Sequence, residues 1–375
     1  MKKEINIALI GTRFMGRAHT NAWIDVTGFY DLPIQPVLKA ACDIDPALEE
    51  SFARRHGWES FETSWEKVVS RDDIDVVDIC TSNASHHPIA LAAASAGKHI
   101  LCEKPLAMSG DQAREMAEAA DHAGVVNMTA FNYRRVPAVQ YAKQMIGEGK
   151  LGRIYHFNAV YLQDFFADPG FLWLWRCDRE IAGSGAHGDM NAHIVDLARY
   201  LVGEFASVSG AMETFTRERP KPDGSMGRVT VDDATYFMAR FDNGALGSFN
   251  ATRCASGRKN HMRIEIYGSK GSLVFNLERL NELEYFSASD APGEQGFRNI
   301  IVTEKEHPYI RKWWPPGHII GWEHTFIHEI GDFLTAIASN QKVTPDFEDG
   351  YRCQQVLDAV IQSAREGQWQ QIPAN

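Results

Sequence analysis

Three side chains in two short segments are of the types that move a proton during the oxidation of an alcohol. Lys104 lies in the motif E-K-P at the end of an apolar run, and Asp189 and His193 lie four residues apart. Such an oxidation needs a base for the hydroxyl proton and a donor that stabilises the developing charge on oxygen. Because imidazole titrates near neutral pH, we predict His193 as the base. Lys104 is the predicted donor, and Asp189 orients the imidazole or holds substrate hydroxyls.

Each of these features also has a simpler explanation. The E-K-P motif can be an ordinary strand end, and Asp189 with His193 can be a surface pair on a helix, where i,i+4 neighbours meet. A zinc site formed by His187, Asp189 and His193 is a third option, since H-x-D-x-x-x-H is similar to zinc-ligand spacing. Zinc would leave Lys104 and the glycine motif described next without a role. We therefore predict no metal.

A glycine motif follows the first apolar run of the chain. Residues 11–16 read G-T-R-F-M-G and open a helical segment, which is the context expected for a dinucleotide-binding turn. Gly11 permits the tight turn, and Gly16 permits close packing of helix on strand. A pyrophosphate is expected on the N–H groups of the helix start, where the helix dipole favours an anion. Arg13 replaces the usual middle glycine and is either a surface side chain or a phosphate partner.

Asp43 ends the second apolar run, at the place where an acid accepts hydrogen bonds from the adenosine ribose. A carboxylate there repels a 2′-phosphate, and no arginine follows directly. The sequence therefore favours NAD over NADP. The alternative is that Asp43 is an acid that merely flanks a helix.

Short apolar runs alternate with helical segments over the first third of the chain. Such runs are typical of parallel strands covered on both faces, and here they are Ile5–Ile10, Val37–Cys42, Ile74–Cys80, His99–Cys102 and Val125–Ala130. Repeated βα units predict a doubly wound parallel sheet. We assign residues 1–132 to this Rossmann domain, and the overall fold class is α/β.

The pattern changes after residue 132 to strands joined by tight turns. Asp242-Asn243-Gly244 and Gly268–Gly271 have the composition of hairpin turns. Residues 133–375 are therefore predicted to form an α+β domain with a large, mainly antiparallel open sheet. Residues 217–228, rich in Pro, Gly and charge, are predicted to form a mobile loop.

The bulk composition excludes several classes of protein. A net charge of −11 without a basic block argues against nucleic acid, and no run approaches the length of a membrane span. The apolar run near the N-terminus is too short for a signal peptide. The six cysteines show no C-x-x-C spacing, which favours a reducing, cytoplasmic location.

Tryptophan is concentrated in the later part of the chain. The segment 171–176 reads FLWLWR, and Trp313, Trp314 and Trp322 follow. Sugar rings pack their C–H faces on aromatic rings while their hydroxyls seek polar side chains. Arg176, His318 and His324 are candidate hydroxyl partners. The alternative is that the tryptophans belong to the core or to a subunit interface.

Five segments resemble the glucose–fructose oxidoreductase / inositol dehydrogenase / rhizopine catabolism (Gfo/Idh/MocA) family over essentially the whole chain. They are IALIGTRFMGRAH, DICTSNASHHPIALAAASAGKHILCEKPLA, FNYRRVPAV, GSGAHGDMNAHIVDLARYLVG and YGSKGSL. The family motifs place its catalytic lysine, aspartate and histidine at Lys104, Asp189 and His193. Two departures are Arg13 in the glycine motif and Asn191, which stands where glycine is common and is a candidate substrate contact.

The resemblance implies an NAD-dependent sugar or cyclic-polyol dehydrogenase, a cis Lys104–Pro105 peptide, and a homodimer or homotetramer formed through the second domain's sheet. The tryptophan-rich segments are most similar to those of members acting on pyranose rings. The predicted cofactor-binding residues are Gly11, Arg13, Phe14, Met15, Gly16, Asp43, Thr81, Ser82, Asn83, His86, Glu103, Lys104, Asn132 and Arg134. The predicted substrate-binding residues are Lys104, Tyr133, Trp175, Arg176, Asp189, Asn191, His193 and His324.

Two other functions stay open at the level of sequence. An enzyme of this kind can use transient oxidation by bound NAD to cleave a glycosidic bond by elimination. A catalytically silent nucleotide-binding sensor is the other alternative, although the joint presence of Lys104, Asp189 and His193 argues against it.

Overall fold

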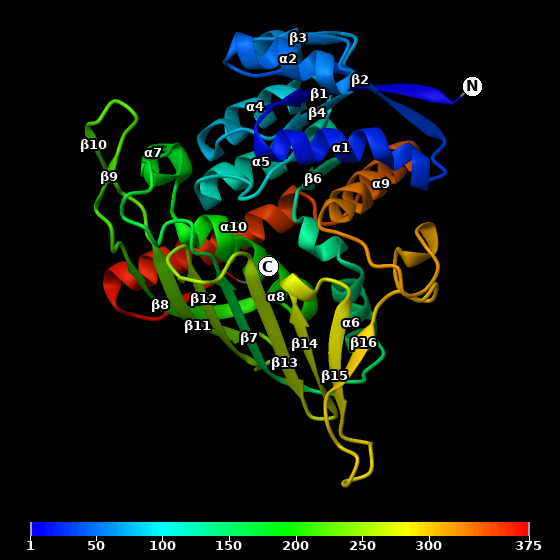
Figure 1. Ribbon diagram of the computed structural model, residues 1–375, viewed down its shortest axis with the longest axis vertical. Coiled ribbons are helices and arrows are strands. Elements are labelled where there is room, and N and C mark those ends of the chain that lie inside the picture. The colour runs from blue at the N-terminus through cyan, green and yellow to red at the C-terminus, as the bar shows by residue number, and fades with distance from the viewer. Residues whose placement is uncertain (1, 374–375) are drawn as a thin grey trace. The chain divides into compact units, whose positions relative to one another are not determined.

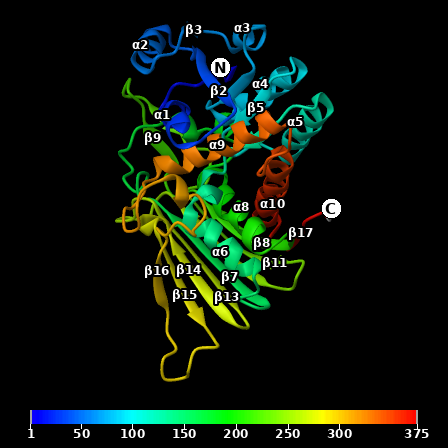
Figure 2. The same ribbon diagram turned by 90° about the vertical axis from the view of Figure 1, so that its right-hand side faces the viewer.

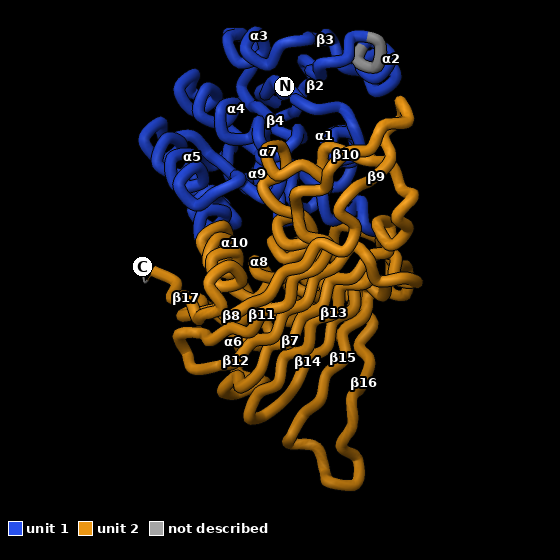
Figure 3. The backbone as a smooth tube through the Cα atoms, turned by 90° about the vertical axis from the view of Figure 1, so that its left-hand side faces the viewer, with its two compact units in different colours: residues 1–132, 321–352 blue, residues 133–320, 353–375 orange. Residues whose placement is uncertain are grey.

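The chain folds into two compact units, each described here by itself. The structure is a computed structural model that describes residues 2–373, apart from the side chains of residues 47–49. The first unit contains residues 1–132 and 321–352, and the second contains residues 133–320 and 353–375 (Figure 3). The sequence placed everything beyond residue 132 in the second domain. In the structure, residues 321–352 pack with the first unit.

The first unit is built on a six-stranded parallel sheet in the order β3-β2-β1-β4-β5-β6. Of the two central strands, β4 is buried along its whole length and β1 over its last four residues, as apolar runs covered on both faces should be. Its strands are β1 (Lys3–Ile10), β2 (Ile34–Cys42), β3 (Ser60–Glu62), β4 (Val76–Ile79), β5 (His99–Cys102) and β6 (Asn127–Thr129). The helices between them are α1 (Phe14–Phe29), α2 (Pro46–His56), α3 (Trp65–Val69), α4 (Asn83–Ser95) and α5 (Gly110–Ala123) (Figure 1). Strand β3 and helix α3 were not predicted.

Helix α9 (Glu323–Ser339) is the reason why residues 321–352 belong to the first unit. It packs against α1, and the two helices run side by side in Figures 1 and 2. Phe326 lies against the His19 ring of α1 at 5.4 Å. Gly331 lies under the Tyr30 ring, where a Cβ would come within 2.4 Å of a ring carbon. The close approach of the two helices therefore requires glycine at this position.

The second unit contains a nine-stranded sheet in the order β16-β15-β14-β13-β7-β12-β11-β8-β17. Its pairs are antiparallel except for β7 with β12. The strands are β7 (Ile154–Leu162), β8 (Phe205–Glu213), β11 (Ala234–Phe241), β12 (Leu246–Thr252), β13 (His261–Gly268), β14 (Gly271–Asn276), β15 (Glu282–Ser287), β16 (Arg298–Ile301) and β17 (Gln370–Gln371). Both predicted hairpin turns are present, and the predicted fold class is confirmed.

The two faces of this sheet differ. Alternate residues of β11 are buried, and Phe237 stacks on Phe249 of β12 at 4.3 Å in the core of the unit. Helices α6 (Pro137–Gly147), α8 (Ala192–Leu201) and part of α10 (Phe347–Glu366) cover this inner face (Figure 1). On the outer face, Tyr236 and Met238 are more than half exposed. Period-two alternation therefore produces one covered and one open face.

Residues 217–228 form a hairpin rather than the predicted mobile loop. Strands β9 (Glu218–Pro220) and β10 (Met226–Arg228) pair antiparallel. The side chain of Arg219 is fully buried, donates to the carbonyls of Phe166 and Asp168, and stacks on the Phe166 ring at 4.3 Å. The polar composition of the segment hid this anchor, so the prediction was wrong.

Candidate active site

The glycine motif joins β1 to α1 at the point where the strand order of the parallel sheet reverses. Gly11 has φ +97°, and a Cβ there would lie 2.5 Å from the Cys80 carbonyl oxygen. A Cβ on Gly16 would lie 2.0 Å from the Gly11 carbonyl oxygen. Both positions therefore require glycine, as a turn that lets a nucleotide approach the backbone does.

The other loop residues predicted to contact the cofactor lie around the same edge of the sheet. Arg13 is exposed and precedes α1, whose first residues are Phe14 and Met15. Thr81 and Ser82 follow β4, and Asn83 begins α4. Ligands of open parallel sheets bind outside the carboxyl ends of the strands at such a reversal point, so this loop set fits a dinucleotide.

Asp43 lies beside the glycine turn and is oriented by it. Its Oδ2 accepts a hydrogen bond from the Thr12 backbone N–H at 3.0 Å and another from the Thr12 hydroxyl at 2.8 Å. The carboxylate is partly exposed. Neutral donors therefore hold a negative group at the end of β2, where it can favour NAD over a cofactor that carries a 2′-phosphate.

Lys104 follows β5 and is partly buried, and the Lys104–Pro105 peptide is cis, as the family resemblance implies. The backbone N–H of Lys104 donates to Glu103 Oε2 at 2.9 Å. On the other side, the Pro105 carbonyl lies 3.0 Å from Nδ1 of the buried His86 ring. The backbone on both sides of the lysine is therefore tied to buried side chains.

In the second unit, Asp189 lies in a π-helical turn, His187–Asn191, directly before α8. One carboxylate oxygen, Oδ2, accepts a hydrogen bond from Nη2 of Arg253 at 2.8 Å. Arg253 is only 1% exposed, and its guanidinium also reaches the Arg176 carbonyl at 3.4 Å. A π-helical turn is a recurring feature of functional sites, and here it changes the simple i,i+4 geometry that the sequence suggested.

Arg253 is a functional candidate that the sequence did not indicate. It directly follows β12, far along the chain from Asp189, and stands in no recognisable motif. The only sequence signal is a charged residue at the end of an alternating strand, which is commonplace. Its pairing with Asp189 depends on tertiary structure.

His193 packs against two tyrosine rings. The ring centroids of His193 and Tyr133 are 4.4 Å apart, and those of His193 and Tyr161 are 5.9 Å apart. Tyr161 donates to Asn260 Oδ1 at 2.8 Å and also bonds the Tyr133 hydroxyl at 3.0 Å. An amide oxygen can only accept, so the Tyr133 hydroxyl donates to Tyr161. Burial raises the pKa of Tyr161, which keeps this chain protonated.

Four predicted cofactor-binding side chains are buried and already hydrogen-bonded. Glu103 holds the Lys104 amide, and His86 faces the carbonyls of Pro105 and Thr81. The Asn132 amide donates to the Thr325 hydroxyl at 2.8 Å. The four residues, each at most 4% exposed, are His86, Glu103, Asn132 and Arg134. Their side chains thus support the structure instead of presenting polar atoms to a ligand.

Arg134 is the most extensively bonded of these four residues. Its Nε lies 3.0 Å from Oδ1 and 2.9 Å from Oδ2 of Asp196, its Nη2 lies 2.6 Å from Oδ1, and the guanidinium lies over the Tyr200 ring. Both side chains of the ion pair are almost completely buried. The guanidinium is therefore committed to the core of the second unit.

Asn191 and His187 are also structural. Asn191 is fully buried and donates to His187 Nδ1 at 3.0 Å, while His187 Nε2 faces the Leu357 carbonyl at 2.9 Å. Asn191, a predicted substrate contact, has no solvent-exposed surface in the structure. The zinc alternative loses a ligand because both ring nitrogens of His187 are hydrogen-bonded.

The aromatic candidates divide between the two units. Arg176 lies over the Trp175 ring at 4.3 Å in the second unit, and both side chains are partly exposed. Trp322 stacks on Phe14 at 5.5 Å in the first unit, next to the glycine motif. Nδ1 of the nearby His324 accepts from the Gly321 N–H, and burial lowers the pKa of that histidine. Trp322 thus packs on the helix that follows the nucleotide turn.

Comparisons with known proteins identify relatives that match this chain over its full length. Residues 5–131 match the model of an oxidoreductase family with an NAD-binding Rossmann fold, and residues 139–274 match that of the GFO/IDH/MocA C-terminal domain. Levoglucosan dehydrogenase of Pseudarthrobacter phenanthrenivorans is 44% identical, with 99% of each chain covered.

Two solved structures are similar throughout. A structure of levoglucosan dehydrogenase in complex with NADH and levoglucosan has a TM-score of 0.96 and 46% identity, covering 99% of this chain and 100% of the other. An oxidoreductase domain protein from Kribbella flavida has a TM-score of 0.97 and 49% identity, with both chains fully covered. This chain belongs to the GFO/IDH/MocA family of NAD-binding oxidoreductases.

Proposed function

We propose that the chain is an NAD-dependent dehydrogenase that interconverts a secondary alcohol of an anhydropyranose, of the levoglucosan class, with its ketone. The observation that carries this proposal is the 44% identity to levoglucosan dehydrogenase over 99% of both chains. The glycine turn and the oriented Asp43 carboxylate support NAD as cofactor. When bound, NAD accepts the hydride from the alcohol carbon.

In this proposal, two side chains handle the proton and the reacting oxygen, and two others bind sugar hydroxyls. Lys104 donates a hydrogen bond to that oxygen and stabilises its negative charge, and His193 exchanges the hydroxyl proton. Asp189 accepts hydrogen bonds from sugar hydroxyls through the carboxylate that Arg253 holds in place. The Tyr133 oxygen, whose hydrogen is used toward Tyr161, is suited to accept from another hydroxyl.

A panel assay tests the substrate class. Purified protein with NAD is incubated with levoglucosan, glucose and myo-inositol, and the absorbance of reduced nicotinamide is followed. The proposal predicts the highest kcat/KM for levoglucosan, because its bridged ring is the substrate named for a close relative. A clear preference for an inositol, or release of an aglycone without net cofactor reduction, would reject it.

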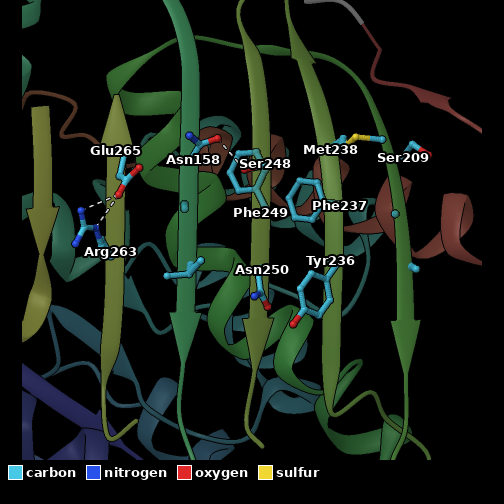
Figure 4. Close-up of a pocket in the computed structure, with 14 residues that line it drawn as sticks. Asn158, Ser209, Tyr236, Phe237, Met238, Ser248, Phe249, Asn250, Arg263 and Glu265 are labelled. Carbon is cyan, nitrogen blue, oxygen red and sulfur yellow. Dashed lines mark hydrogen bonds and ion pairs between the residues drawn. The ribbon is translucent and has the colours of Figure 1, made fainter. Parts of the chain in front are cut away.

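We also propose that the outer face of the nine-stranded sheet binds a second copy of the chain, giving a homodimer or homotetramer. Support comes from the family resemblance and from exposed apolar side chains on that face, including Tyr236, Met238 and Leu246. Figure 4 shows a shallow groove here, lined across neighbouring strands. Light scattering of wild type and Met238→Glu tests this interface. The variant should have the mass of a dissociated chain, and a variant with the same oligomeric mass as wild type would reject the interface.

A cytoplasmic location is also proposed. It is supported by the six cysteines, which form no disulfide within the described residues. No described helix is both long and apolar enough to span a bilayer.

A further inference from the structure

A fully buried histidine of the first unit lies between two carboxylates. Nδ1 of His19, on α1, is 3.0 Å from both oxygens of Asp78, and Nε2 is 3.2 Å from Glu103 Oε1. Ionised carboxylate oxygens can only accept hydrogen bonds, so each ring nitrogen must carry a hydrogen. His19 is therefore an imidazolium that joins two acids.

Both acids also accept hydrogen bonds from other donors. Asp78 Oδ2 accepts from the Trp23 indole at 2.8 Å, and Glu103 Oε2 accepts from the Lys104 backbone N–H at 2.9 Å. Burial, the largest single effect, lowers the pKa of His19, but the interactions with Asp78 and Cys80 together outweigh it and raise this pKa well above its ordinary value. A continuous chain of hydrogen bonds thus runs from α1 through Glu103 to the backbone of Lys104.

A second buried histidine holds the opposite side of the same peptide. His86, on α4, is fully buried, and its ring nitrogens lie 3.0 Å from the Pro105 carbonyl and 3.3 Å from the Thr81 carbonyl. Burial lowers the pKa of His86, so this ring is neutral and has one hydrogen to donate. The shorter contact assigns that hydrogen to Nδ1 and Pro105.

We propose that His19 and His86 are positioning residues that fix the backbone on both sides of Lys104, His19 through Glu103 and His86 through the Pro105 carbonyl. This inference rests on the proposed role of Lys104 in the reaction. Helices α1 and α4 begin at the two loops that form the candidate nucleotide site, so the same two elements that would contact the cofactor also hold the lysine.

The energetics favour positioning over stability as the purpose of the His19 network. Taking an imidazolium and two carboxylates out of water costs several kcal/mol per ion, and apolar replacements of buried ion pairs are often neutral or stabilising. A lysine amine on a four-carbon stem gains precision only if its backbone is fixed. The network can hold the backbone of Lys104 through hydrogen bonds, whereas a hydrophobic cluster could not.

Metal binding is a less suitable explanation of the same cluster. Ligand atoms of His19, Asp78 and Cys80 lie within 4.8 Å of one another. However, Asp78 already receives the Trp23 indole, and burial raises the pKa of the Cys80 thiol, which keeps its proton. The His19 ring nitrogen and the Cys80 thiol thus carry protons, and Asp78 accepts hydrogen bonds, so none of the three groups is available to a metal ion.

Isosteric variants of the network provide the kinetic test. In Glu103→Gln, the amide NH2 must face either the His19 N–H or the Lys104 N–H, both of which are donors. His19→Gln removes one of the two ring contacts. We expect each variant to lower kcat by about 10- to 100-fold, the size of effect that a small misplacement of a reacting group produces. NADH affinity, measured by fluorescence titration, should change much less than kcat.

The double variant His19→Gln/Glu103→Gln distinguishes a chain of contacts from two separate defects. The effects of residues that act through one chain of hydrogen bonds are not additive. The kcat of the double variant should therefore be no lower than that of the slower single variant. His122→Gln, an exposed position, and His87→Gln, next to His86, are matched controls with wild-type activity. Folded single variants with kcat within about twofold of wild type, or fully additive losses, would overturn the inference.

A second measurement does not depend on turnover. Lysines are reductively methylated with 13C-formaldehyde, and the Lys104 resonance is assigned by its loss in Lys104→Arg. His19→Gln, Glu103→Gln and His86→Gln should each move this resonance toward that of exposed lysines, and an unmoved resonance would reject positioning. If wild type oxidises no sugar, the proposed function fails, but this resonance still decides the inference.

Discussion

The two units hold their candidate catalytic side chains by different means. In the first unit, buried charged and neutral histidines hold the backbone beside Lys104. In the second unit, His193 packs on tyrosine rings, and Asp189 is held by one buried arginine. The difference follows side-chain length: a short ring or carboxylate can be placed by direct contact, whereas a long flexible amine is placed through its backbone.

The largest expected effect comes from removing the two groups that handle oxygen and proton. Lys104→Met and His193→Asn should each lower kcat by about 1,000-fold or more, since charge stabilisation and general-base catalysis each contribute factors of this size. Steady-state kinetics with levoglucosan measure the loss. Lys305→Met, at an exposed lysine, is the matched control with unchanged kcat. A loss below tenfold in either variant would remove that residue from the mechanism.

Arg253→Met tests the direct contact in the second unit. Asp189 would lose its charged partner, and we expect kcat/KM to fall by about 100-fold, equivalent to about 2.7 kcal/mol of transition-state stabilisation. Arg219→Met is a matched control, because Arg219 is equally buried and stacks on the same Phe166 ring but bonds only carbonyls. Both variants should melt at lower temperature. Equal losses of kcat/KM would show that Arg253 acts through stability alone.

Asp43→Asn tests a carboxylate of the first unit that the backbone N–H and the hydroxyl of Thr12 hold. Removing its charge relieves repulsion of a 2′-phosphate, so the ratio of kcat/KM for NADP to that for NAD should rise by about tenfold, or about 1.4 kcal/mol. Asp45→Asn, two residues along, serves as control. An unchanged ratio would mean that Asp43 takes no part in cofactor choice.

The smallest expected effect is a pH dependence of stability. Because folding raises the pKa of His19, its stabilising contribution is fully present below its unfolded value of about 6.5 and is lost as pH rises through the folded pKa. The melting-temperature difference between wild type and His19→Gln should therefore shrink as the pH is raised from slightly acidic to alkaline. A difference that grows with pH would contradict an imidazolium at this position.

Local patterns were enough to predict most of the fold. Apolar runs, turn residues and the two glycines of the nucleotide loop indicated both sheets, because these features depend on near neighbours in the chain. The packing of residues 321–352 with the first unit depends on contacts between α9 and α1, such as Phe326 on His19, which local patterns do not show. An amphipathic helix does not reveal its partner.

The sequence indicated the candidate catalytic residues through their motifs, but it did not indicate the residues that hold them in place. Lys104, Asp189 and His193 stand in recognisable segments, whereas Arg253 pairs with Asp189 across 64 positions of the chain. His86 and Glu103 were among the residues predicted to contact the cofactor. Both are buried, a property that their positions in the sequence could not show.

Transfer of deuterium tests the central claim most directly. Levoglucosan carrying deuterium at its carbinol carbons is incubated with the protein and NAD, and the products are analysed by mass spectrometry and NMR. We predict one deuterium in each NADH formed, together with an equivalent amount of sugar ketone. Deuterium that remains in the sugar or appears in water, with no labelled NADH, would contradict the account.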